Sequence, residues 1–128
     1  MAKRDVGPIN ETEWDLLEVL WEVRRSTARE VAEALHDKRG WAYSTVKTLL
    51  DRMVEKGLVS GRRVGNVWEY TPAVRPAEAR RTAWRRFVDT AFGGAMDPAL
   101  RFIADDARLT DKQRETLREL LAEIGDEE

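Results

Sequence analysis

Apolar residues recur at helical spacing in the first half of the chain, and two of these runs begin with the same start signal. Asn10 and Glu13 have the spacing of a capping box, and a helix is predicted from there to about Val23. Thr27 and Glu30 repeat the signal and predict a second helix, which ends before the polar sequence DKRG. The apolar residues that should face inward from this second helix are Val31, Ala34 and Leu35.

A third run, WAYSTVKTLLDRMVEKGLV at residues 41–59, has the most regular apolar stripe. The stripe predicts a buried helix face formed by Val46, Leu49, Leu50, Met53 and Val54. Ser44 or Thr45 can cap this helix, and Gly57 can end it in the left-handed conformation. The link DKRGWAY is longer than the roughly three or four residues of a plain helix-turn-helix, which leaves room for a short strand edge or turn near Trp41.

A β-hairpin is predicted next, from LVSGRRV and VWEYTP, because Gly65 and Asn66 between them tolerate positive φ and suit a tight turn. Trp68 and Tyr70 stand two residues apart, so they should share one face of a strand. Three helices followed by a two-stranded hairpin is the order of elements in a winged helix. The tryptophans of the chain are expected to pack in the core rather than to stack on bases, and they are Trp14, Trp21, Trp41, Trp68 and Trp84.

The sequence TPAVRPAE, with two prolines, interrupts the apolar periodicity and predicts a domain boundary. A winged-helix DNA-binding domain is expected at residues 1–72 and a helical dimerisation domain at residues 73–128. The predicted fold class is therefore mainly α, with an N-terminal winged helix-turn-helix followed by a three-helix C-terminal dimerisation arm.

The helices of that second half begin after Pro76 and have ends marked by helix-breaking or capping residues. The marks are Gly93 with Gly94, Asp97 with Pro98, and Thr110 with Gln113. Three helices make too small a core to stand alone, so their apolar stripes either fold back on the first domain or pair with a second copy. The glycines and prolines favour a separate arm and hence a homodimer. The residues predicted at the dimer interface are Phe87, Val88, Leu100, Ile103, Leu117, Leu120, Leu121 and Ile124.

The net charge and the distribution of charged residues indicate which kind of partner the protein binds. The net charge of −2 argues against a protein that coats nucleic acid everywhere, because that task needs a surplus of cations. Residues 36–72, however, hold seven Lys or Arg and four acids, a local excess of three positive charges. A basic face on a nearly neutral protein favours recognition of particular DNA sites.

The residue types and motifs that the sequence lacks argue against several other classes of protein. Cysteine is absent and His36 is the single histidine, so neither a metal centre nor any cofactor is expected, and His36 is interpreted as a helix-end residue. No Gly-rich phosphate loop or nucleophile with a histidine base supports an enzyme. The start MAKRDVGPIN lacks the apolar core of a signal peptide, and no apolar run approaches the roughly 20 residues of a membrane span. A cytoplasmic location without membrane insertion is therefore expected.

A candidate DNA-binding face lies opposite the apolar stripe of residues 41–59. Short hydroxyl groups let the backbone come close to DNA, and long cations reach phosphates or base edges. The predicted DNA-binding residues are Ser44, Thr45, Lys47, Thr48 and Arg52 on the helix, and Arg62, Arg63 and Asn66 on the hairpin. Such a helix face can also be merely solvated, and a charged hairpin edge can also serve to prevent strand association.

The sequences EWDLLEVLW, WAYSTVKTLLDRMVEKGLV and VWEYTP together resemble the penicillinase-repressor (BlaI/MecI/CopY-type) family of bacterial winged-helix regulators. The resemblance covers residues 10–72 closely and the rest more loosely. It implies a homodimer that binds a near-palindromic operator in double-stranded DNA and blocks transcription, with DNA contacts at Ser44, Thr45, Thr48 and Arg52. The chain differs from some relatives, which carry lysine in place of Ser44 and histidine in place of Lys47. A winged helix used only as a protein–protein adaptor, without DNA binding, is the alternative function.

The same resemblance bears on how repression is released. One branch of the family senses copper through cysteines, which this chain lacks, so direct metal sensing is not expected. In another branch a membrane-linked sensor protease system leads to a cut in the dimerisation arm, between an asparagine and a phenylalanine. The matching bond joins Arg101 to Phe102, where the phenylalanine is retained and the asparagine is not.

Overall fold

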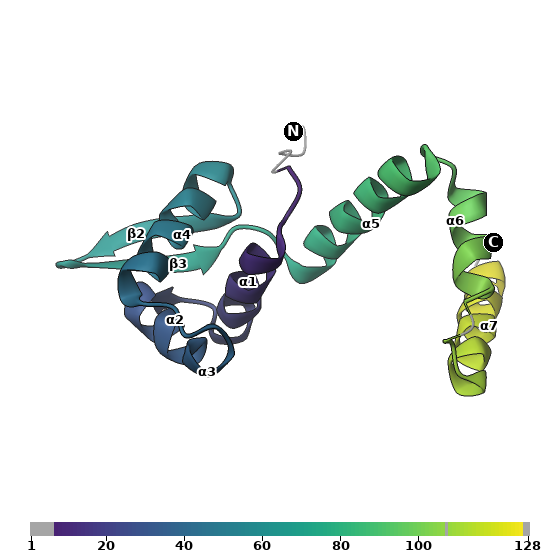
Figure 1. Ribbon diagram of the computed structural model, residues 1–128, viewed down its shortest axis with the longest axis horizontal. Coiled ribbons are helices and arrows are strands. Elements are labelled where there is room, and N and C mark those ends of the chain that lie inside the picture. The colour runs from purple at the N-terminus through teal and green to yellow at the C-terminus, as the bar shows by residue number, and fades with distance from the viewer. Residues whose placement is uncertain (1–6, 107, 127–128) are drawn as a thin grey trace. The chain divides into compact units, whose positions relative to one another are not determined.

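The computed structural model describes residues 7–106 and 108–126, and the side chains of residues 124–126 lie outside that description. The described residues form two compact units, one that ends at Trp84 and one that begins at Arg85. The elements of the first unit are α1 (Glu11–Val23), β1 (Ser26–Thr27), α2 (Ala28–Ala34), α3 (His36–Arg39), α4 (Tyr43–Lys56), β2 (Val59–Val64) and β3 (Val67–Pro72) (Figure 1). Helix α5 (Pro76–Phe92) crosses the division between the units, and α6 (Met96–Ala104) and α7 (Asp111–Asp126) follow it.

Both predicted capping boxes are confirmed at the starts of α1 and α2. The backbone N–H of Glu13 donates to Asn10 Oδ1 at 2.8 Å, while the backbone N–H of Asn10 donates to Glu13 Oε1 at 3.0 Å. Thr27 and Glu30 make the same reciprocal pair of bonds at 3.2 and 2.9 Å. These bonds satisfy backbone donors that a helix start would otherwise leave without partners, so local sequence alone fixes where both helices begin.

Helix α4 begins differently from the prediction and ends as predicted. Its N-cap residue is Ala42, which makes no side-chain cap, so the expectation that Ser44 or Thr45 caps the helix is wrong. Both hydroxyl residues lie inside the first turn, where their side chains remain available for other partners. Gly57 closes the helix with φ +90°, a left-handed conformation in which a Cβ would be strained.

The predicted inward faces of the helices are correct in the centre and wrong at their edges. Val54 is 37% exposed, because it lies at the side of the stripe, next to the hairpin rather than in the core. Ala34 is exposed as well, since Val31 and Leu35 are four residues apart and already occupy the inward side of α2. The fully buried core side chains of this unit include Leu16, Leu17, Leu20, Val31, Val46, Leu50, Met53, Leu58 and Tyr70.

The link between α2 and α4 contains the one-turn helix α3, so the short strand or turn expected near Trp41 is wrong. Helix α3 is held against α1 by the buried carboxylate of Asp15, which accepts from Lys38 Nζ at 2.9 Å and from Arg39 Nε at 2.6 Å. The additional strand lies earlier, at β1, where Ser26 pairs with Tyr70 of β3.

The predicted hairpin is confirmed, and β3 is the central strand of a three-stranded antiparallel sheet in the order β1-β3-β2. Val64 pairs with Val67, so Gly65 and Asn66 form a two-residue turn, with Gly65 at φ +64°. Figure 1 shows this hairpin extending beyond the helices of the first unit as a wing.

The tryptophans occupy less interior positions than predicted. Trp14, Trp21, Trp41 and Trp84 are half-buried, but Trp68 is 44% exposed, so its assignment to the core is wrong. Trp68 and Tyr70 do share one face of β3, because a Cβ added at Gly61 on the paired strand would meet both rings, at 3.6 and 3.5 Å. Tyr70 is buried by α4 while Trp68 lies farther out along the wing, where the helix no longer covers the strand.

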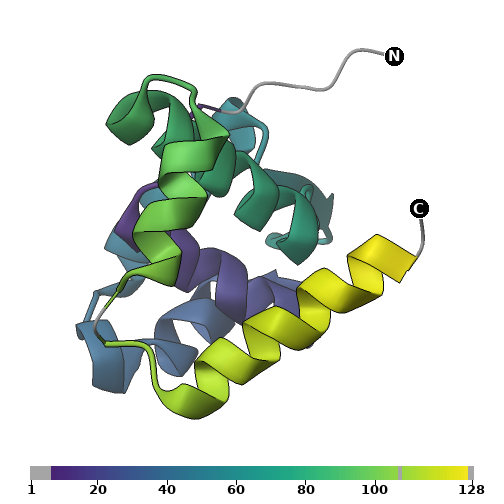
Figure 2. The ribbon, with the colours of Figure 1, turned by 90° about the vertical axis from the view of Figure 1, so that its right-hand side faces the viewer.

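The second unit contains the end of α5 together with α6 and α7. The predicted marks at Gly93 with Gly94 and at Thr110 with Gln113 are confirmed, whereas α6 begins at Met96 after the N-cap Ala95, one residue before Asp97, and has no side-chain cap. Gly93 and Gly94, both with positive φ, follow α5, and Thr110 and Gln113 exchange bonds of 3.1 and 2.8 Å at the start of α7. Figure 2 shows α6 and α7 as separate helices that run in different directions. Within the described part of the chain, no helix combines the length and the apolar character needed to cross a bilayer.

Candidate nucleic-acid interface

The exposed side of α4 carries a shallow hollow of about 290 Å³. It is lined by Ser44, Thr45, Thr48, Leu49 and Arg52, and so brings together four of the five predicted DNA-binding residues of this helix. Their spacing places them on one face, with half-buried Leu49 beneath them and the four polar side chains exposed.

The polar side chains of this hollow are free to bind an external partner. Within the part of the chain that the structure describes, Ser44, Thr45, Thr48 and Arg52 make no side-chain hydrogen bond or ion pair. Hydroxyl and guanidinium groups that are exposed and without an internal partner can donate to phosphate oxygens or to base edges. The hollow therefore presents hydrogen-bonding side chains and one cation, Arg52, on an exposed face of α4.

Helix α4 is held at its C-terminal end and along its inner side, which orients this face. At its C-terminal end Lys56 Nζ donates to Glu13 Oε1 at 2.8 Å and to the carbonyl of Pro8 at 2.6 Å, which ties α4 to the start of α1. Along its inner side Val46 and Leu50 are fully buried in the core. Burial of these apolar side chains contributes most of the free energy that keeps the helix in place.

Lys47, the fifth predicted residue, is oriented toward the wing instead of toward the hollow. Its Nζ donates to Asp51 Oδ1 and Oδ2 at 2.9 and 2.8 Å, and it lies 5.9 Å from the ring centroid of Trp68 and 5.6 Å from that of Tyr70. The hydrogen bond to Asp51, supported by the contact with Tyr70, raises the pKa of Lys47 above its ordinary value.

The pKa values of Asp51 and Tyr70, which both contact Lys47, are shifted as well. Burial alone would raise the pKa of the Asp51 carboxyl group, but the hydrogen bonds from Lys47 and Tyr70 outweigh it and lower that pKa. Burial raises the pKa of the Tyr70 hydroxyl group, which therefore stays protonated and donates to Asp51 Oδ1 at 2.7 Å. At neutral pH Lys47 is therefore a cation, Asp51 is a carboxylate anion and Tyr70 is a neutral phenol.

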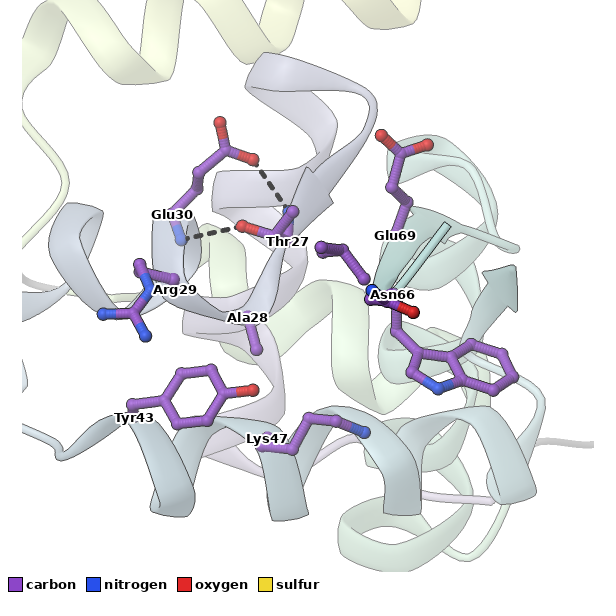
Figure 3. A pocket seen from close by; sticks show the side chains of 10 residues that line it. Thr27, Ala28, Arg29, Glu30, Tyr43, Lys47, Asn66 and Glu69 are labelled. Carbon is purple, nitrogen blue, oxygen red and sulfur yellow. Dashed lines mark hydrogen bonds between the residues drawn. The ribbon is translucent and has the colours of Figure 1, made fainter. Parts of the chain in front are cut away.

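A larger cleft of about 570 Å³ lies between the start of α2, the first turns of α4 and strand β3 (Figure 3). Arg29 and Tyr43 line it, and the Arg29 guanidinium group lies 5.2 Å from the Tyr43 ring centroid. Both residues are exposed, and neither is among the DNA-binding residues predicted from the sequence. Each lies in the first turn of its helix, Arg29 in α2 and Tyr43 in α4, which also carries the predicted DNA-binding face.

The carboxylates of this cleft are already engaged. Glu30 closes the capping box of α2, and the hydrogen bond from the backbone of Thr27 lowers the pKa of its carboxyl group. Glu69 lies 3.7 Å from the Arg25 side chain. The walls of the cleft therefore carry both signs of charge, unlike the hollow on α4.

The three predicted wing residues, Arg62, Arg63 and Asn66, are all exposed. The two arginines are adjacent in β2, so their side chains leave opposite faces of the hairpin. Arg62 stands opposite Glu69, with 4.0 Å between its Nη2 and the Glu69 Oε1, while Arg63 Nε donates to the carbonyl of Gly65 at 3.1 Å. The cations of the wing are thus spread over both of its faces near the tip.

The residues predicted at the dimer interface differ in exposure. Phe87, Leu100, Leu120 and Leu121 are exposed, with 47 to 59% of their surface accessible. Ile103 and Leu117 are half-buried, Val88 is buried, and the side chain of Ile124 lies outside the described residues. Arg101 and Phe102, which flank the bond considered for cleavage, are exposed on α6.

The described residues hold no group of three histidine, cysteine, aspartate or glutamate side chains that could bind a metal ion. His36 starts the one-turn helix α3.

The fold and the exposed face of α4 define a winged-helix protein of the DNA-binding class. A model of the penicillinase repressor family matches residues 9–123, and the chain therefore belongs to the penicillinase repressor family of winged-helix transcriptional regulators. This is a family of repressors and not of enzymes, in agreement with the sequence-based prediction.

Individual relatives support the same assignment. The chain is 23% identical over 125 residues to the penicillinase repressor of Staphylococcus aureus, and the alignment covers 98% of each protein. Its fold is similar to the solution structure of the DNA-binding domain of the repressor BlaI, with a TM-score of 0.52 and 25% identity, over 59% of this chain and 93% of that one. A structure of monomeric BlaI of Bacillus licheniformis in complex with the blaP half-operator matches over the same shares of the two chains, with a TM-score of 0.50 and 25% identity.

Proposed function

We propose that this protein represses transcription by binding, as a homodimer, to a near-palindromic operator. In this proposal the exposed face of α4 enters the major groove, and Ser44, Thr45, Thr48 and Arg52 contact phosphates and base edges. The observation that carries the proposal is the hollow on α4, where these four side chains gather without a side-chain hydrogen bond or ion pair to any described residue. A recognition helix with donors on its N-terminal half has the arrangement that direct contact with base edges needs.

The wing is the second part of the proposed DNA surface. Arg62, Arg63 and Asn66 lie at or near its tip, where they can reach the backbone or the minor groove beside the site of α4. The fold of one chain resembles monomeric BlaI, whose structure contains a half-operator. We accordingly assign one half-site to one copy of this chain.

The second unit supplies dimerisation in this proposal. The exposed Phe87, Leu100, Leu120 and Leu121 present apolar side chains that water solvates poorly, and a second copy would cover them. A dimer joins two half-site affinities, so the operator is bound far more tightly than either half alone.

Release of the operator by proteolysis is the proposed route of induction. The bond between Arg101 and Phe102 lies within α6, and Phe102 is 64% exposed, so its side chain is accessible to a protease. A helix of nine residues is short enough to unwind locally, which cleavage requires. A cut there would separate α7 from the winged helix and lower operator affinity. Mass spectrometry of the protein from induced cells would detect the two fragments, and only full-length protein would contradict this route.

Selection of DNA by the full-length protein tests the main proposal. A random-sequence duplex library is passed over immobilised protein at low salt, and retained duplexes are amplified and sequenced. The proposal expects one enriched sequence with two related half-sites. Absence of any enrichment would contradict it and favour the alternative of a winged-helix adaptor that binds only proteins.

A further inference from the structure

The recognition helix and the wing are joined by a polar contact that lies beside the hollow. Tyr70 Oη of β3 donates to Asp51 Oδ1 of α4 at 2.7 Å, and Lys47 Nζ donates to both oxygens of the same carboxylate. Tyr70 is 1% exposed, so its hydroxyl group has been removed from water and depends on this bond. The carboxylate of Asp51 therefore accepts hydrogen bonds from both α4 and β3, and Asp51 and Tyr70 are 19 residues apart in sequence.

The Lys47 side chain is held on the wing side of α4 by more than the carboxylate. Its ammonium group lies within 5.9 Å of the ring centroids of both Trp68 and Tyr70, which occupy one face of β3. Only 29% of its side chain is exposed. In Figure 3 this side chain runs along α4 away from Tyr43.

These contacts oppose a role for Lys47 in DNA binding. To reach a phosphate the ammonium group would have to leave a carboxylate and two aromatic rings, and it would leave the negative charge of Asp51 uncompensated near the DNA. Arg52 makes no such internal contact within the described residues. Lys47 and Arg52 thus differ in their internal contacts, although both are predicted DNA-binding cations of α4.

We infer that Lys47 is a positioning residue that fixes the wing against α4 through Asp51 and Tyr70, and that it does not contact DNA. The inference rests on the proposed function, because it concerns how the two parts of the DNA surface are held. As a consequence, the hollow on α4 and the tip of the wing bind the operator as one rigid surface.

A charge-neutral double variant tests whether Lys47 contacts DNA. The probe is the duplex enriched by the wild-type protein, and the slope of log K against log salt is measured for the full-length chain. Lys47→Gln combined with Asp51→Asn removes one charge of each sign and should weaken binding about tenfold while leaving the slope unchanged. Arg52→Gln should lower the slope by about 0.9, the loss of one phosphate contact. Lys112→Gln, at an exposed position in α7 of the second unit, controls for loss of a cation outside the winged-helix unit and should change neither quantity.

Tyr70→Phe tests the connection to the wing, because it keeps the buried ring and both charges and removes only the hydroxyl group. Operator affinity should fall several-fold with an unchanged salt slope, and the amides of β2 and β3 should exchange with deuterium faster than in the wild type without DNA. Circular dichroism establishes that the variant is folded at the temperature used.

Two results would overturn the inference. One is a slope lowered by about 0.9 in the double variant, which would mean that Lys47 contacts a phosphate. The other is a Tyr70→Phe protein with wild-type operator affinity and wild-type hairpin exchange. Failure of the wild-type protein to enrich any duplex would instead contradict the proposed function itself, so the two failures are distinguishable.

Discussion

At the scale of single residues, the cations of the winged-helix unit differ in whether a carboxylate already holds them. Lys38 and Arg39 are paired with Asp15, and Lys56 is paired with Glu13. Arg52 has no ion pair within the described part of the chain. The positive charge available to DNA is therefore concentrated on fewer residues than the local excess of basic residues in the sequence indicates.

Sequence analysis could find the residue types of the candidate site but not their partners. The four side chains of the hollow follow from helical spacing, which is a local property of α4. The pairing of Lys38 with Asp15 joins residues 23 apart, and the pairing of Lys56 with Glu13 joins residues 43 apart. Such contacts depend on how α1 packs against the rest of the unit, and no local pattern predicts them.

Arg52→Gln is expected to weaken operator binding about tenfold with little effect on the fold. The loss follows from removal of one charged contact to the DNA backbone, and a surface change usually alters the free energy of unfolding by about 0.5 kcal/mol or less. Fluorescence anisotropy with the selected duplex and urea denaturation measure the two quantities. An unchanged operator affinity would remove Arg52 from the site.

Asp15→Asn is expected to lower the free energy of unfolding at pH 7 by about 1 to 2 kcal/mol, because the buried carboxylate accepts from two cations. The hydrogen bond from Lys38 is the largest cause of the lowered pKa of Asp15. A lowered pKa stabilises the fold above the unfolded value of about 3.9 and loses that contribution as the pH falls through the folded value. Wild-type stability should thus decline more steeply below pH 5 than that of the variant.

Urea denaturation at pH 7 and at about pH 3.5 measures this pH dependence. Glu18→Gln is the matched control, because Glu18 is an exposed carboxylate on the same helix α1. If the two variants showed the same pH dependence of unfolding, the role assigned to Asp15 would be wrong.

At the scale of elements, local signals determined most helices and the hairpin, and tertiary pairing determined the rest. The capping boxes, Gly57 and the turn at Gly65 each act within a few residues, so their elements were predicted correctly. Strand β1 has two residues and exists because Ser26 pairs with Tyr70, far away in sequence. Neither β1 nor the one-turn helix α3 is long enough to show a periodicity.

Gly57→Ala is expected to destabilise the protein by about 1 to 2 kcal/mol, because residue 57 has φ +90° and a Cβ is strained in that conformation. Gly61→Ala is the matched control: its φ lies outside the left-handed region, and its added Cβ would make contacts at ordinary distances of 3.5 Å or more. Urea denaturation of both variants measures the difference, and equal stabilities would contradict the account of how α4 ends.

At the scale of the whole molecule, the described residues form two compact units. The large core cluster lies in the first unit, which also carries the exposed polar face of α4, while large apolar side chains are exposed in both units. The division after Trp84 falls inside α5, while the sequence predicts a boundary at Pro72 and Pro76, the second of which is the first residue of this helix. A proline pattern marks where a helix can begin, but it does not show which core the first turns of that helix join.

Leu120→Asp is expected to dissociate the proposed dimer, because a charge would be buried without a partner at the interface. Ala122→Asp is the matched control, since it adds the same charge at an exposed position on the opposite side of α7. Sedimentation velocity at micromolar concentration should find a monomer for the first variant and a dimer for the second. A dimer that survives Leu120→Asp would show that the interface lies elsewhere.

The central claim is that this chain is a dimeric repressor that recognises a specific operator. Titration of the full-length protein with the selected duplex and with a scrambled duplex, over a series of salt concentrations, tests it most directly. A dimeric repressor should bind with two chains per selected duplex, bind the scrambled duplex much more weakly, and lose affinity steeply as salt increases. Equal binding to both duplexes, or no binding even at low salt, would contradict it.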